Sequence, residues 1–360
     1  MSVLDLNSII SQVKTNCNIS DAKFWGTYSI CGLLMRFREL YRKEQNILPW
    51  QQISQKDIAE WIADRENLWQ RLSDEDFQNI SPGGNAYAPF DVKKINAALR
   101  DEGLVYGAGF GAYMKPSFFL AELVSSELTE GYETHIAGNE LARDLSAYPA
   151  MLQGSTIFAR RDALSILLWD KYEEMTAKKH VSALSYAFSA YNIYSGEQTL
   201  EDAYKKVLEI TERESETYIY HEVGEAFEGS RLGSVWKDML SDLRNRRVEF
   251  FVRGIKDVLS DTSEKGMLKH VIEKDKKGSL GFYVALLGGF RKLIFPEIKE
   301  SFHDFTLTED WAAIEKVRRI GYRRAEEISS KIIDIYNPET DNTRMNEFIE
   351  KELIPSITPQ

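Results

Sequence analysis

Apolar residues recur at steps of three and four over most of this sequence, which is the spacing of one face of an α-helix. Such a stripe runs between residues 20 and 43, with Ser20 as its predicted N-cap, and Ser54 has the residue type that opens a second helix. Further helices are predicted at 133–146, 156–179, 181–194, 200–228, 232–243, 245–260, 265–274, 279–294, 308–336 and 341–352. The pattern therefore predicts a mainly α protein, a multi-helix bundle of one or two lobes.

One glycine-rich stretch interrupts the helical spacing. Gly107, Gly109 and Gly111 alternate with larger residues, and Pro116 follows where a helix would have to begin. The GxGxG spacing differs from the GxGxxG of a dinucleotide-binding turn, and no Gly-Lys-Ser/Thr follows as in a nucleotide-binding P-loop. We therefore predict one small β-hairpin near 104–119, with glycines at positive φ, and no cofactor-binding loop; an irregular glycine-rich loop packed on helices is the alternative.

The length of 360 residues fits two domains at about 150 residues each. Breakers concentrate between Ser81 and Pro89, just before the glycine-rich stretch. The sequence thus predicts an N-terminal helical lobe over 1–120 that ends in the hairpin, followed by a helical bundle over 121–360. A single domain is the alternative.

Charge and composition exclude several classes of protein. The chain has 56 acidic and 45 basic residues, and a net charge of −11 disfavours nucleic-acid binding through a whole-chain basic field. Two cysteines, Cys17 and Cys31, do not make a disulfide framework. The longest weakly polar run, 278–290, is shorter than the ~20 residues of a membrane helix, and the first residues do not resemble a signal peptide. We expect a cytoplasmic protein without a membrane partner, which could form a homo-oligomer.

The segment from Tyr218 to Glu228 carries the sharpest chemical pattern. On a helix, His221, Glu225 and Glu228 fall in a narrow arc because they follow one another at i, i+4 and i+7. An imidazole and carboxylates one turn apart are ligands that zinc and non-haem iron use in helical bundles. The sequence therefore predicts a divalent metal (Zn or Fe) or an acid–base site on the 200–228 helix. The second histidine of a zincin His-Glu-x-x-His motif is absent.

A bundle site needs further residues, and two carboxylates are candidates for catalysis, Glu222 and Glu140. The predicted helix 133–146 would bring Glu133, Glu140 and Asp144 to one face, with His135 pointing elsewhere. The competing interpretation is a solvated acidic face, because the apolar residues of the 200–228 helix lie opposite His221. Gly224 argues against it, since a mid-helix glycine costs ~1 kcal/mol relative to alanine without a packing or ligand reason.

Several stretches together resemble an uncharacterised bacterial family of cytosolic helical proteins, as found in sulfate-reducing and related anaerobes. The stretches are Leu33–Tyr41, Leu48–Trp50, Tyr106–Gly109, Met114–Pro116, His135–Arg143 and Tyr220–Glu225. The resemblance covers most of the chain and implies no activity, so no functional residue is transferred from it. Two functions remain open: an enzyme built on the His221 stripe, or a non-catalytic interaction or scaffold protein that uses helix faces.

Overall fold

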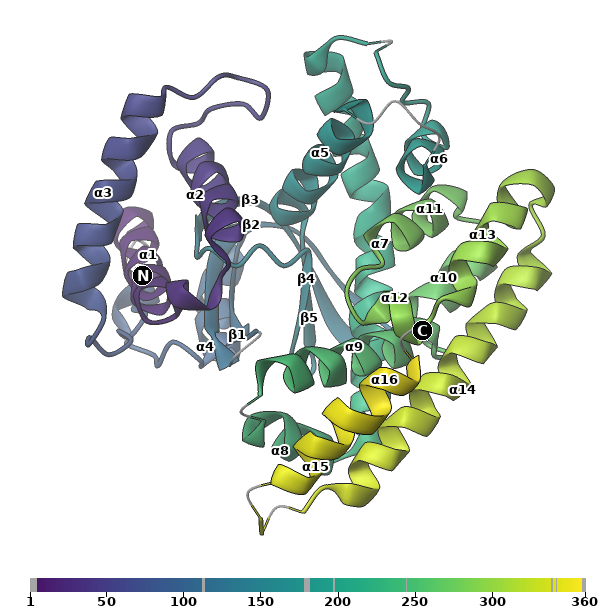
Figure 1. The fold of residues 1–360 in the computed structure, drawn as a ribbon. Helices are drawn as coiled ribbons and strands as arrows, with labels where there is room; N and C mark the ends of the chain where they lie inside the picture. Colours follow the sequence, from purple (N-terminus) through teal and green to yellow (C-terminus); the bar gives the residue numbers. More distant parts are fainter. Residues whose placement is uncertain are drawn as a thin grey trace. The chain divides into compact units, whose positions relative to one another are not determined.

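The computed structural model describes residues 5–111, 114–177, 182–196, 198–243, 245–337, 339–340 and 342–357. The chain divides into two compact units, Met1–Asp170 and Lys171–Gln360 (Figure 1). The division lies about 50 residues after the boundary that the sequence suggested at residue 120, and it falls within helix α5 (Arg161–Ala177).

The N-terminal unit contains a five-stranded sheet in the order β1-β2-β3-β5-β4. Its strands are β1 (Leu104–Phe110), β2 (Pro116–Thr129), β3 (Tyr132–Arg143), β4 (Ala150–Gln153) and β5 (Thr156–Arg160). Neighbours pair antiparallel except β3 and β5, which are parallel. The prediction of a mainly α bundle with one small hairpin near 104–119 is therefore wrong, and the fold is α/β.

The predicted helix over 133–146 is a strand for most of its length. β3 turns back on β2 through Glu130 and Gly131, whose φ angles of 50° and 90° are the positive values that a two-residue hairpin turn requires. β3 pairs with β2 along one edge and with β5 along the other. These two partners supply the backbone hydrogen bonds, and they override the helical propensity of residues such as Ala137, Leu141 and Ala142.

The helices of this unit are α1 (Leu6–Phe24), α2 (Ile30–Glu44), α3 (Gln55–Leu72) and α4 (Val92–Leu99), with 3₁₀ turns at Trp25–Thr27, Pro82–Gly84 and Arg100–Glu102. α1 packs against β2 and β3, α4 packs against β1, and α3 packs against α1 and α2. Ser54 caps α3 by accepting a hydrogen bond from the Asp57 amide, as predicted. Ser20 is not an N-cap, because it lies inside α1 and donates its hydroxyl hydrogen bond to the Pro116 carbonyl. The helix boundary lies instead at Phe24, ahead of the 3₁₀ turn.

The glycines of the predicted hairpin serve packing and not a tight turn. Gly107 and Gly109 lie in β1, and neither they nor Gly111 adopt positive φ, so that part of the prediction is wrong. A Cβ on Gly107 would lie 2.6 Å from the Cζ atom of Phe119, which is buried in the sheet. A Cβ on Gly109 would lie 2.9 Å from the side-chain nitrogen of Gln153. Each glycine leaves room for a neighbouring side chain.

Replacing Gly107 with alanine is expected to destabilise the N-terminal unit by about 2 kcal/mol, because the Phe119 ring is enclosed and cannot move aside without repacking. Chemical denaturation of the full chain measures this loss. The matched variant is Gly26→Ala in the 3₁₀ turn after α1, where a Cβ meets nothing within 4 Å. Equal stability of the two variants would contradict the packing role of Gly107.

β1 and β4 are the two edge strands of the sheet, and a side chain links them. The Gln153 side chain at the end of β4 accepts a hydrogen bond of 3.1 Å from the Ala108 amide of β1. The Ala108 amide on the β1 edge is therefore satisfied by a side chain from β4, the strand at the opposite edge of the sheet.

In the C-terminal unit, the described residues form helices joined by loops, and none of them belongs to a β-strand. After the end of α5 it contains α6 (Ala183–Ser189), α7 (Leu200–Leu232), α8 (Ser234–Asp242), α9 (Arg246–Thr262), α10 (Met267–Glu273), α11 (Lys277–Leu286), α12 (Arg291–Ile294), α13 (Glu297–Thr308), α14 (Trp311–Ile335), α15 (Thr343–Phe348), a π-helical turn (Ile349–Leu353) and α16 (Ile354–Ile357). α9 lies in the middle of its apolar core, with both α7 and α14 packed against it. Among the described residues, no helix combines the length and apolarity that crossing a membrane requires.

Candidate metal centre

Gly224 lies where α7 packs closely against the last turn of α9. A Cβ on this residue would overlap the carbonyl oxygen of Ser260 in α9 and would lie 3.0 Å from the Cα atom of Gly266. The mid-helix glycine therefore has a packing reason. The close approach also allows side chains on either side of Gly224 to meet side chains of α9.

His221, one turn before Glu225 on α7, forms a hydrogen bond with Asp261 in the last turn of α9. Its Nδ1 atom lies 2.6 Å from Oδ1 of Asp261, whose side chain is only 1% exposed, while the His221 side chain is 21% exposed. A carboxylate at this distance fixes the orientation of the ring. The other ring nitrogen, Nε2, is left for a different partner.

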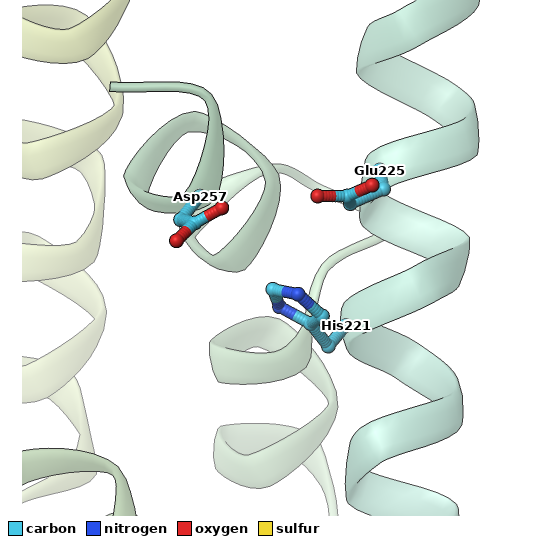
Figure 2. A group of neighbouring side chains, drawn as sticks. All are labelled: His221, Glu225 and Asp257. Carbon is cyan, nitrogen blue, oxygen red and sulfur yellow. The ribbon is translucent and has the colours of Figure 1, made fainter. Parts of the chain in front are cut away.

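Glu225 and Asp257 complete a group of three side chains. Asp257 lies one turn before Asp261 on α9, so two i, i+4 pairs from two packed helices face each other. One potential ligand atom each from His221, Glu225 and Asp257 lies within 4.8 Å of the other two. Figure 2 shows these three side chains converging from the two helices.

Two cations adjoin the group. The Lys256 ammonium lies 2.7 Å from the Glu225 carboxylate, and the Arg291 guanidinium lies 3.9 Å from Asp257. The carboxylates whose charges act on this group are Glu222, Glu225, Asp257 and Asp261, and the Arg253 guanidinium also acts on Glu225. Carboxylates and cations therefore meet at this part of the α7–α9 contact.

The pKa shifts follow from these charges. Burial lowers the pKa of His221, but the charge and hydrogen bond of Asp261, with the charges of Glu222 and Glu225, outweigh burial and raise it to about 10. Burial raises the pKa of Asp257 to about 6, with Glu225 adding to the rise and His221 opposing it. Burial also acts to raise the pKa of Glu225, yet Lys256 and His221 hold it below its usual value. At neutral pH the cluster carries an imidazolium.

Glu228 and Glu222 have other surroundings. The Glu228 carboxylate is fully buried and accepts hydrogen bonds from Arg231 at 2.7 Å and from the Tyr322 hydroxyl of α14 at 3.0 Å. It therefore pairs α7 with α14 and does not face His221 and Glu225. Glu222 is 7% exposed and acts on His221 through its charge.

The carboxylates expected from 133–146 lie in the N-terminal unit, on or just after β3. Glu140 accepts a hydrogen bond of 2.6 Å from Arg160, and Asp144 forms an ion pair of 3.2 Å with Lys115. His135 bonds to Ser126 across the β2–β3 hairpin, 2.7 Å from Nδ1 to the hydroxyl. The helical face proposed for Glu133, Glu140 and Asp144 does not exist, because successive residues of a strand point to opposite faces.

Comparisons with known proteins give a family and no activity. The model of the family of unknown function (DUF6866) N-terminal domain matches residues 8–160, and the model of its C-terminal domain matches residues 165–355. No curated protein and no solved structure matches the chain. The matched regions agree with the two units of the fold, and the His221 cluster lies in the second. The expectation of an uncharacterised family is confirmed: the chain belongs to the family of unknown function DUF6866.

Proposed function

We propose that the C-terminal unit binds one divalent transition-metal ion, zinc or ferrous iron, through His221, Glu225 and Asp257. The observation that carries this proposal is the convergence of their ligand atoms within 4.8 Å from two helices. Donor atoms that share one zinc ion at ~2.0–2.2 Å are about 3.5 Å apart, so small side-chain rotations suffice to close the site. An imidazole with two carboxylates suits zinc and iron.

Asp261 supports this function as a positioning residue. A histidine that ligates a metal donates its other N–H to a carboxylate or carbonyl, which fixes its tautomer and increases its basicity. The Nδ1–Asp261 hydrogen bond supplies that arrangement and leaves Nε2 for the ion. Three protein ligands leave a position for water, and an ion there would lower the pKa of that water and polarise a substrate oxygen.

In the metal-free protein, the charges of Lys256 and of protonated His221 neutralise carboxylates that a bound metal ion would otherwise neutralise. The Lys256 ammonium neutralises Glu225, and the imidazolium neutralises Asp261. A metal ion has to displace the proton and weaken the Lys256–Glu225 pair. Lys256→Gln should therefore bind zinc more tightly than the unaltered protein, because a competing cation is removed.

Zinc titration of the full chain, purified without a metal-affinity column, tests the proposal. We expect one zinc ion per chain, measured by competition with a chromophoric chelator. His221→Ala should weaken binding by about 100-fold or more, because a direct ligand is lost. The control is His303→Ala, which removes an exposed histidine of α13 in the same unit.

A second pair of variants distinguishes the ligand set seen in the structure, which includes Asp257, from the i, i+4, i+7 set of the sequence, which includes Glu228. Asp257→Asn should weaken zinc binding, whereas Glu228→Gln should leave the affinity unchanged because Glu228 is held by Arg231 and Tyr322. If zinc binds equally to the unaltered chain and to His221→Ala, or binds to neither, the cluster is an ion-paired network that only stabilises the α7–α9 contact.

A further inference from the structure

The N-terminal unit contains a partly open polar cavity of about 250 Å³, and none of its lining residues belongs to the His221 cluster. Its walls come from α1, α2, α3 and the end of β3. Arg143, the last residue of β3, lines it together with neighbouring residues of that strand. A space of this size accommodates a small polar molecule.

Arg143 is the unusual group in this wall. Its side chain is 4% exposed, and its Nε and Nη1 atoms have no hydrogen-bond partner in the described part of the chain. The Oε2 atom of Glu140 lies 3.8 Å from Nη1 of Arg143, which is beyond hydrogen-bond distance. That oxygen also has no hydrogen-bond partner among the described residues. A guanidinium is always charged, and leaving its buried donors without hydrogen-bond partners is energetically unfavourable.

Apart from Lys14, the other ionic groups of the wall are already matched, with the Asp21 carboxylate 3.1 Å from the Lys115 ammonium. Arg65 pairs with Glu44 at 2.6 Å, and the Lys43 ammonium pairs with Asp162. Glu140 is held through its second oxygen by Arg160, at 2.6 Å. Its charge is therefore shared with a closer guanidinium, and Arg143 retains positive charge that faces the cavity region.

We propose that this cavity binds a small organic anion and that Arg143 holds its carboxylate or phosphate group. The planar fork of N–H donors on arginine matches the oxygens of both groups, and Arg143 lines the cavity. Lys14, an exposed residue of α1 in the same wall, adds a second positive charge. The mixed charge of the remaining wall favours a small ligand that carries hydrogen-bond donors as well as the anionic group.

Thermal denaturation of the full chain with inorganic phosphate, and separately with succinate, tests this site. Chloride at matched ionic strength controls for salt effects. We expect at least one of the two probes to raise the melting temperature in a saturable manner, and the responding probe identifies phosphate or carboxylate as the recognised group. Arg143→Met should increase the Kd of that probe at least tenfold, because the charged fork is lost. Arg100→Met is the matched control, since Arg100 is an exposed arginine of the same unit with a side chain 66% exposed.

Arg143→Lys provides a second variant that keeps the charge and removes the fork. It should bind the probe several-fold more weakly than the unaltered chain. If Arg143→Met does not fold, this variant alone tests whether Arg143 holds the anion. The proposal is overturned if neither probe shifts the melting temperature beyond the chloride control, which would mean that water satisfies Arg143. It is equally overturned if Arg143→Lys and Arg100→Met bind the responding probe as tightly as the unaltered chain.

Discussion

Replacing Gly224 with alanine is expected to destabilise the C-terminal unit by about 2–3 kcal/mol. The added methyl group meets the Ser260 carbonyl and the Gly266 backbone, which can yield only if α7 and α9 separate. Alanine in a helix gains up to ~1 kcal/mol over glycine, so this loss is the net of overpacking and helix propensity. Chemical denaturation followed by far-UV circular dichroism measures it.

Gly229→Ala on the same helix is the matched control. A Cβ there meets nothing within 4 Å, so the substitution should stabilise the unit by ~0.5–1 kcal/mol through helix propensity alone. If Gly224→Ala were as stable as Gly229→Ala, α7 and α9 would not be in the close contact that brings His221 to Asp261.

Zinc binding is expected to release about one proton per ion near pH 7.5 and to tighten about tenfold for each pH unit between 6.5 and 9. The reason is that a metal ligand must be deprotonated, and the pKa of His221 is raised to about 10 in the metal-free protein. Below pH 6 the dependence should steepen, because Asp257, with its pKa of about 6, also holds a proton. Isothermal titration calorimetry in buffers of different ionisation enthalpy counts the protons.

The metal-free chain should show the opposite pH trend in stability. A folded pKa above the unfolded value means that the His221 proton stabilises the fold fully below the unfolded pKa of ~6.5, and that this contribution is lost as pH rises through about 10. The gain in melting temperature produced by zinc should therefore increase from pH 6.5 to pH 9. An affinity that stays constant above pH 7.5 would show that His221 titrates near its ordinary pKa and would contradict the raised value.

Helical spacing located much of the candidate metal centre. It placed His221 and Glu225 on one face of a helix, and both join the group of converging ligand atoms. Asp257 and Asp261 were not among the predicted ligands, although the same i, i+4 spacing links them, and the predicted helix ended at residue 260, one residue before Asp261. Glu228 continued the arc in sequence, but the burial that pairs it with Tyr322 depends on α14, nearly 100 residues later. Helical phase alone carries no information about such a partner.

The sheet could not be derived in the same way. β3 contains residues that suit a helix, and its parallel partner β5 pairs through a register set by tertiary contact. A local signal did exist in the two residues Glu130 and Gly131, because a glycine in a two-residue connection between β-rich segments is a hairpin signature. Ala137, Leu141 and Ala142 in the following stretch favour a helix, and they outweighed this hairpin signal in the prediction.

The hydrogen bond from Ala108 to Gln153 bears on how this chain behaves at high concentration. An open sheet edge invites a strand from another molecule to add, which is a route to aggregation. Here one edge strand has only four residues, and the opposite one has a backbone donor occupied by a glutamine side chain. Gln153 thus occupies one of the donors that an added strand would need, and its loss would leave the Ala108 amide open on the β1 edge.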